Sequence, residues 1–139
     1  MTARVLVDTG PLVAILLKTE QHHKVCVEQL RSIGPPLLTC WPVITEAAWL
    51  LRRSPAAVQR LLGFFDAGVL RLLSLEQEAI PSMAAFLQRY RSIRADIADA
   101  ALVYLAEREG VETIFTLDHG DFSVYRLSRN RSFQLLPRL

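Results

Sequence analysis

Short apolar segments alternate with helical stretches along the whole of this 139-residue chain. Strands are predicted at residues 4–7, 37–41, 69–73, 113–117 and 133–136, the last of them at a sheet edge. Strands that are mostly apolar and separated by helices are typical of a parallel sheet buried on both faces. The sequence therefore predicts an α/β fold in which residues 1–139 form a single domain around a mainly parallel sheet.

Proline, serine and glycine residues mark many of the predicted helix ends. The expected helices cover residues 12–17, 20–33, 42–53, 55–68, 75–90 and 97–109. Pro11 and Pro42 open two of them, Ser54 is a predicted N-cap, and Gly110 closes the last. Within residues 75–90, Pro81 must either kink the helix or mark its real start.

The composition favours a cytoplasmic protein without a membrane partner. No apolar run approaches the roughly 18 residues needed to cross a bilayer, and the segment before Asp8 is too short for a signal peptide. Cys26 and Cys40 have no CxxC spacing and are expected as reduced core residues. The net charge is only +2, and a basic set that is arginine except for Lys18 and Lys24 gives weak support for nucleic-acid binding.

Acidic residues stand where the predicted strands end and the predicted helices begin. Asp8 and Asp118 each follow a strand, and Glu46 lies near the first turn of a helix. Asp96 and Asp99 stand three residues apart at the start of another helix. Because the carboxyl ends of parallel strands lie at one rim of a sheet, these acids are expected to form one negatively charged pocket.

Each of these acids also has a purely structural interpretation. Asp8 could cap a helix, and Glu46 could complement a helix dipole. Asp96 with Asp99 has the spacing of a capping box, and Asp118 could belong to a polar turn. Structural caps have no reason to converge, however, because carboxylates within about 4–6 Å raise each other's pKa. A divalent cation removes that cost, and Mg²⁺ binds a few carboxylates while keeping sites for water and phosphate oxygens. The pattern therefore predicts a metal-dependent enzyme that acts on phosphate esters.

Two other kinds of phosphate-handling domain fit the sequence poorly. A receiver-like phospho-acceptor domain needs a lysine on a late loop, and the lysines end at Lys24. A haloacid-dehalogenase-type phosphatase would have a second acid two residues after Asp8, where Gly10 stands.

The four acidic segments, in this order, resemble the motifs of the PIN domain, in particular those of the VapC-type toxin ribonucleases. Residues 7–12 resemble the opening motif, 45–46 the second and 99–103 the third, and 116–118 with Asp121 and Phe122 resemble the closing one. The resemblance covers nearly the whole chain. It implies an α/β/α sandwich, Mg²⁺ or Mn²⁺ as cofactor, and cleavage of single-stranded RNA.

The resemblance also implies the site residues and the partners. Asp8, Glu46, Asp99 and Asp118 are the expected metal ligands, and Asp96 joins them in the expected catalytic set. Because Asp96 adds an acid before Asp99, the assignment of the third ligand stays open. A homodimer and a cognate antitoxin are the expected protein partners. The alternatives are a PIN nuclease that processes RNA without being a toxin, and a catalytically silent module that binds RNA or an antitoxin.

Trp41 and Trp49 are expected in the core or in a subunit interface rather than stacked on bases. Arginines near the rim, among them Arg52 and Arg94, are expected to contribute to RNA specificity.

Overall fold

The computed structural model describes residues 4–138 and contains a five-stranded sheet with the strand order β3-β2-β1-β4-β7. Its strands are β1 (Leu6–Val7), β2 (Leu37–Thr39), β3 (Leu70–Leu72), β4 (Thr113–Phe115) and β7 (Gln134–Leu136). Every neighbouring pair is parallel. All five predicted strands are therefore present, each slightly shorter than predicted, and β7 lies at one edge of the sheet as expected.

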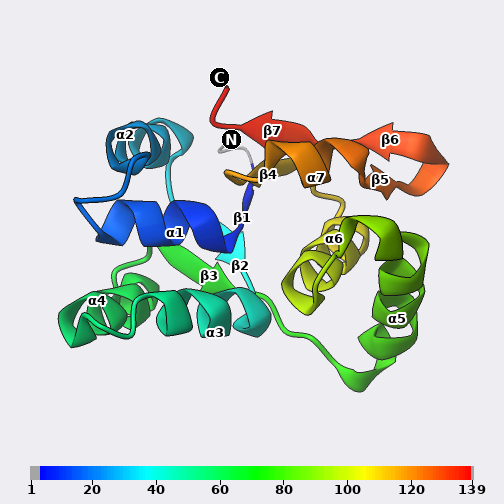
Figure 1. Ribbon diagram of the computed structural model, residues 1–139, viewed down its shortest axis with the longest axis horizontal. Coiled ribbons are helices and arrows are strands. Elements are labelled where there is room, and N and C mark those ends of the chain that lie inside the picture. The colour runs from blue at the N-terminus through cyan, green and yellow to red at the C-terminus, as the bar shows by residue number, and fades with distance from the viewer. Residues whose placement is uncertain (1–3, 139) are drawn as a thin grey trace.

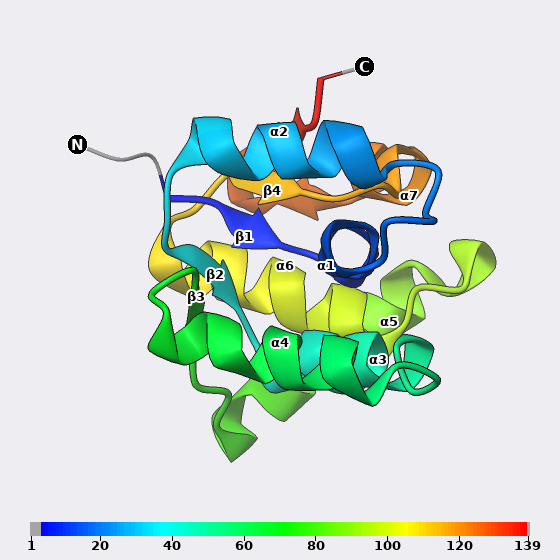
Figure 2. The ribbon, with the colours of Figure 1, turned by 90° about the vertical axis from the view of Figure 1, so that its left-hand side faces the viewer.

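Helices cover both faces of the sheet, which confirms the α/β/α sandwich. The helices are α1 (Thr9–Leu16), α2 (His23–Ile33), α3 (Trp41–Leu50), α4 (Pro55–Asp66), α5 (Ile80–Arg89), α6 (Ile97–Glu109) and α7 (His119–Val124). In Figure 1, α1, α2 and α4 lie on one side of the sheet and α5, α6 and α7 on the other. Figure 2 shows α2 and α4 in front of the sheet.

The strand order explains this division of the helices. The chain passes from β1 to β2 and β3 in one direction and then returns past β1 to form β4. Because β-helix-β connections are right-handed, helices that connect strands laid down in one direction lie on one face of the sheet. Helices that connect strands laid down in the other direction lie on the opposite face. The reversal leaves a crevice at the carboxyl ends of β1 and β4, which is where open α/β sheets bind ligands.

Several helix starts differ from the prediction. Asp8 caps α1, so Pro11 is the third helical residue rather than the first. Proline is tolerated there because the first four N–H groups of a helix have no partner within the helix. The predicted helix at 75–90 is divided into a short 3₁₀ turn, Gln77–Ala79, and α5, in which Pro81 is the second residue. Pro81 therefore marks a helix start and does not kink one.

The remaining short elements were not predicted. They are α7, the 3₁₀ turns Arg91–Ile93 and Ser128–Asn130, and an antiparallel pair formed by β5 (Arg126–Leu127) and β6 (Arg131–Ser132). None of the helices in residues 4–138 is long and apolar enough to span a membrane.

The core lies between the sheet and the two helical layers. Leu6, Val7, Ile114 and Phe115 of the two central strands are fully buried. Both cysteines are buried and unpaired, as predicted. Burial of apolar side chains of this kind is the main stabilising contribution to the fold.

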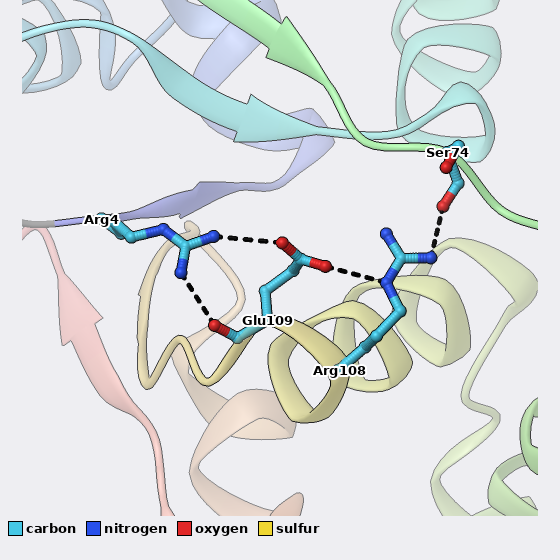
Figure 3. Close-up of polar contacts among 4 residues, drawn as sticks. All are labelled: Arg4, Ser74, Arg108 and Glu109. Carbon is cyan, nitrogen blue, oxygen red and sulfur yellow. Dashed lines mark hydrogen bonds and ion pairs between the residues drawn. The ribbon is translucent and has the colours of Figure 1, made fainter.

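A polar cluster joins three segments at the amino-terminal end of β1 (Figure 3). Arg4 donates to the backbone oxygen of Glu109 at 2.8 Å and to its carboxylate at 3.2 Å. Arg108 donates to the same carboxylate at 2.9 Å and to the backbone oxygen of Ser74 at 2.7 Å. These arginines lower the pKa of Glu109, the hydrogen bond from Arg108 being the largest cause. The cluster lies at the end of β1 and α6 opposite to the acidic residues.

Candidate active site

Asp8 is fixed at the junction of β1 and α1. Its backbone N–H donates to the oxygen of Phe115 in β4, which continues the pairing of β1 with β4. One carboxylate oxygen accepts a hydrogen bond from the N–H of Thr9 at 2.8 Å, and the other accepts one from the hydroxyl of Thr116 at 2.9 Å. Burial raises the pKa of Asp8 to about 6, in spite of these hydrogen bonds. Asp8 is thus both a helix cap and a buried acid.

Asp96 and Asp99 occupy the start of α6 and have different environments. Asp96 is exposed and is the N-cap, and its side chain accepts a hydrogen bond from the N–H of Asp99 at 2.9 Å. Asp99 is buried, and its carboxylate accepts a hydrogen bond from the hydroxyl of Tyr125 at 2.6 Å. Burial is the largest cause that raises the pKa of Asp99 to about 8, and the charges of Asp96, Asp8 and Asp118 add to it.

Asp118 and Asp121 stand at the start of α7, and their carboxylates lie near that of Asp99. Asp118 follows β4 and caps α7, accepting a hydrogen bond from the N–H of Asp121 at 3.2 Å. Carboxylate oxygens of Asp99, Asp118 and Asp121 all lie within 4.8 Å of one another. Burial raises the pKa of Asp121, and its contact with Asp118 raises it further.

These acids line one pocket of about 440 Å³, called here the acidic pocket. Its lining consists of Asp8, Thr9, Gly10, Glu46, Leu50, Arg94, Asp96, Asp99, Leu117, Asp118 and Asp121. The structure therefore brings together all five acids singled out from the sequence. The pocket lies at the crevice between the carboxyl ends of β1 and β4, where the strand order reverses.

Two details of the predicted set are different in the structure. Glu46 is the sixth residue of α3, which begins at Trp41, and so lies in the second turn of the helix rather than near the first. Asp121 was absent from the expected ligands although it lines the pocket. Its signal in the sequence was the three-residue spacing from Asp118, which repeats the spacing of Asp96 and Asp99.

The donor set could bind a divalent metal ion. The oxygens of Asp99, Asp118 and Asp121 are close enough to share one cation, and hard oxygen ligands are those that Mg²⁺ and Mn²⁺ prefer. The raised pKa values of Asp8 and Asp99 show that full ionisation of the pocket is costly without a compensating positive charge. Among the described residues that line the pocket, Arg94 is the one cationic side chain.

An apolar groove adjoins the acidic pocket and shares Glu46 and Asp96 with it. Trp41 and Trp49 of α3 line this groove and are 60% and 63% exposed, which excludes the core as their place. The other expected place, a subunit interface, stays a prediction. Ile97 in the same groove is 59% exposed. Apolar side chains exposed together in this way mark a surface for interaction.

Comparison with known proteins identifies the family. The PIN domain profile matches residues 5–127. Ribonuclease VapC26 of Mycobacterium tuberculosis is 30% identical over 134 residues, which covers 95% of this chain and 99% of VapC26.

Two solved structures have the same fold. The crystal structure of Mycobacterium tuberculosis VapC20, described as a Sarcin-Ricin loop cleaving toxin, matches with a TM-score of 0.76 and 18% identity over 83% of this chain and 90% of that chain. A toxin-antitoxin complex from Klebsiella pneumoniae matches with a TM-score of 0.65 and 16% identity over 88% and 92%. At these identities the structural matches show the fold alone, whereas the profile and the similarity to VapC26 show the relationship. The chain belongs to the PIN-domain family and, within it, to the VapC ribonucleases.

Proposed function

We propose that this protein is a Mg²⁺- or Mn²⁺-dependent endoribonuclease that cleaves single-stranded RNA, and that it is the toxin of a toxin–antitoxin pair. The observation that carries the proposal is the convergence of Asp8, Asp99, Asp118 and Asp121 in one pocket of a VapC-family chain. Acids that served only as helix caps would not be expected to cluster in this way, because their like charges repel.

In this proposal some acids bind the metal ion and the others add negative charge around it. Asp99, Asp118 and Asp121 have oxygens close enough to bind one ion, and Asp8 and Glu46 complete the negative lining of the pocket. When bound, the cation supplies the positive charge that polarises a water molecule and stabilises the developing charge on the phosphate. Arg94 lines the pocket, which supports a role for it in binding a phosphate oxygen of the RNA.

The proposed partners follow from the relatives and from the exposed groove. The Klebsiella structure is a toxin-antitoxin complex, and this supports a cognate antitoxin for the present chain. Trp41, Trp49 and Ile97 form an exposed apolar surface, which supports a homodimer contact along α3. Retention of every acid in the pocket argues against a catalytically silent binding module.

The direct test is cleavage of a single-stranded RNA oligonucleotide by the purified protein. We expect cleavage with Mn²⁺ or Mg²⁺, none in the presence of a chelator, and none by Asp8→Asn. Asparagine keeps the helix cap at this position, so the variant should remain folded. Cleavage that persists in chelator, or undiminished cleavage by Asp8→Asn, would refute the proposal.

A further inference from the structure

The Asp99 carboxylate is held by a phenol that belongs to none of the acidic motifs. The hydroxyl of Tyr125 donates to Oδ2 of Asp99 at 2.6 Å, which is a short O–H···O hydrogen bond. Tyr125 is fully buried and is not among the residues that line the acidic pocket. Its hydroxyl therefore reaches Asp99 from the protein interior, on the side away from substrate.

Three aromatic rings fix the position of that hydroxyl. The Tyr125 ring lies 4.9 Å from those of Phe86 and Tyr90 and 5.0 Å from that of Phe122, measured between centroids, and all three contacts are edge-to-face. Edge-to-face contacts of this kind are favourable and directional. Because the ring is enclosed, the Asp99 carboxylate has to adopt the orientation that the phenol sets.

The same hydrogen bond couples the two helices that carry the clustered acids. Tyr125 follows α7, and its N–H donates to the backbone oxygen of Asp121 at 3.2 Å. Asp99 belongs to α6, whereas Asp118 and Asp121 belong to the start of α7. Tyr125 therefore fixes the position of one acid relative to the other two.

Thr116 holds the carboxylate of Asp8 in a similar way. Its hydroxyl donates to Oδ2 of Asp8 and accepts a hydrogen bond from the N–H of Asp118 at 3.0 Å. Each of the two buried carboxylates thus has one oxygen bound to a buried hydroxyl. Among the hydrogen bonds of residues 4–138, none engages Oδ1 of Asp99, so this oxygen remains available to a ligand.

We propose that Tyr125 is a positioning residue for the metal site, which orients Asp99 so that it presents one oxygen alongside Asp118 and Asp121. This inference rests on the proposed metal-dependent function. Groups that orient a ligating side chain by hydrogen bonding typically change metal affinity or activity by about 10–100-fold when they are removed.

The test compares two Tyr→Phe variants from the same aromatic cluster. Tyr125→Phe keeps every ring atom and removes the bond to Asp99. Tyr90→Phe is the matched control, because its hydroxyl accepts from the N–H of Arg126 at 3.0 Å and has no acidic partner among the described hydrogen bonds. Titration calorimetry with Mn²⁺ alone should show affinity about tenfold or more weaker for Tyr125→Phe and unchanged for Tyr90→Phe.

Cleavage kinetics at saturating Mn²⁺ distinguish a defect in the metal site from a general loss of structure or of RNA binding. Tyr125→Phe should then have the RNA KM of the wild type, because its defect lies in metal binding. Unchanged Mn²⁺ affinity in Tyr125→Phe, an equal loss in Tyr90→Phe, or a raised RNA KM at saturating Mn²⁺ would overturn the inference and leave the proposed function intact. A wild-type protein that binds no Mn²⁺ would overturn both.

Discussion

At the scale of single residues, Asp8 and Asp99 are acids that the fold makes costly to ionise. Burial raises their pKa values from 3.8 to about 6 and about 8. The folded protein therefore holds these protons more tightly than the unfolded chain does. The stability linked to them is fully present below the unfolded pKa of 3.8 and is lost as the pH rises through the folded values.

We therefore expect the metal-free protein to lose stability between about pH 4 and pH 8, with Asp8 contributing roughly 3 kcal/mol of the loss. Denaturant unfolding in chelator at several pH values measures this change. Asp8→Asn keeps the cap and removes the titration, so it should lose less stability over the same range. An equally steep loss in Asp8→Asn would show that Asp8 does not ionise at this cost.

At the scale of elements, the start of α6 carries two acids with different positions: Asp96 caps the helix, and Asp99 is buried. Asp96→Ser should keep the cap and lose at most a modest part of the cleavage rate, whereas Asp96→Ala should cost roughly 0.5–2 kcal/mol of stability. Asp99→Asn should reduce activity far more than stability, because Asp99 faces the other acids and does not cap the helix. Cleavage rates and thermal unfolding at one saturating Mn²⁺ concentration measure both effects. An inactive Asp96→Ser with an active Asp99→Asn would reverse the two roles.

The elements that the sequence predicted well are those with a strong local pattern. The apolar runs that contain β1, β2, β3, β4 and β7 were sufficient to predict the parallel sheet, and Ser54 and Gly110 correctly marked helix ends. The six-residue helix α7 was missed because it is too short to show a helical repeat. Its main local signal was the capping spacing of Asp118 and Asp121, which was interpreted as a motif and not as a helix start.

Contacts that depend on tertiary structure could not be predicted. The hydrogen bond between Tyr125 and Asp99 joins residues 26 positions apart, and no local pattern indicates it. The sequence also left open whether Trp41 and Trp49 lie in the core or in a subunit interface, because a large aromatic residue on a helix has the same pattern whether it faces the core or a partner.

At the scale of the whole molecule, a structural polar cluster and the acidic pocket lie at opposite ends of the sheet. The cluster of Arg4, Arg108 and Glu109 joins segments at the amino-terminal end of β1, and the acids meet at the carboxyl ends of β1 and β4. The two central strands lie side by side in register, Leu6 with Ile114 and Val7 with Phe115. The pairing of β1 with β4, together with the Thr116 hydroxyl that bonds both Asp8 and the N–H of Asp118, therefore sets the position of Asp118 relative to Asp8.

We propose that water hydrolyses the RNA backbone at this acidic pocket, and the ends of the cleavage products test this claim most directly. A single-stranded RNA oligonucleotide should be cleaved with Mn²⁺ and its products analysed by mass spectrometry. Attack by water does not use the 2′-hydroxyl. With the 3′-oxygen as the leaving group, the upstream product should end in a 3′-hydroxyl and the downstream product should carry a 5′-phosphate. Products that end in a 2′,3′-cyclic phosphate would contradict metal-assisted hydrolysis by these acids.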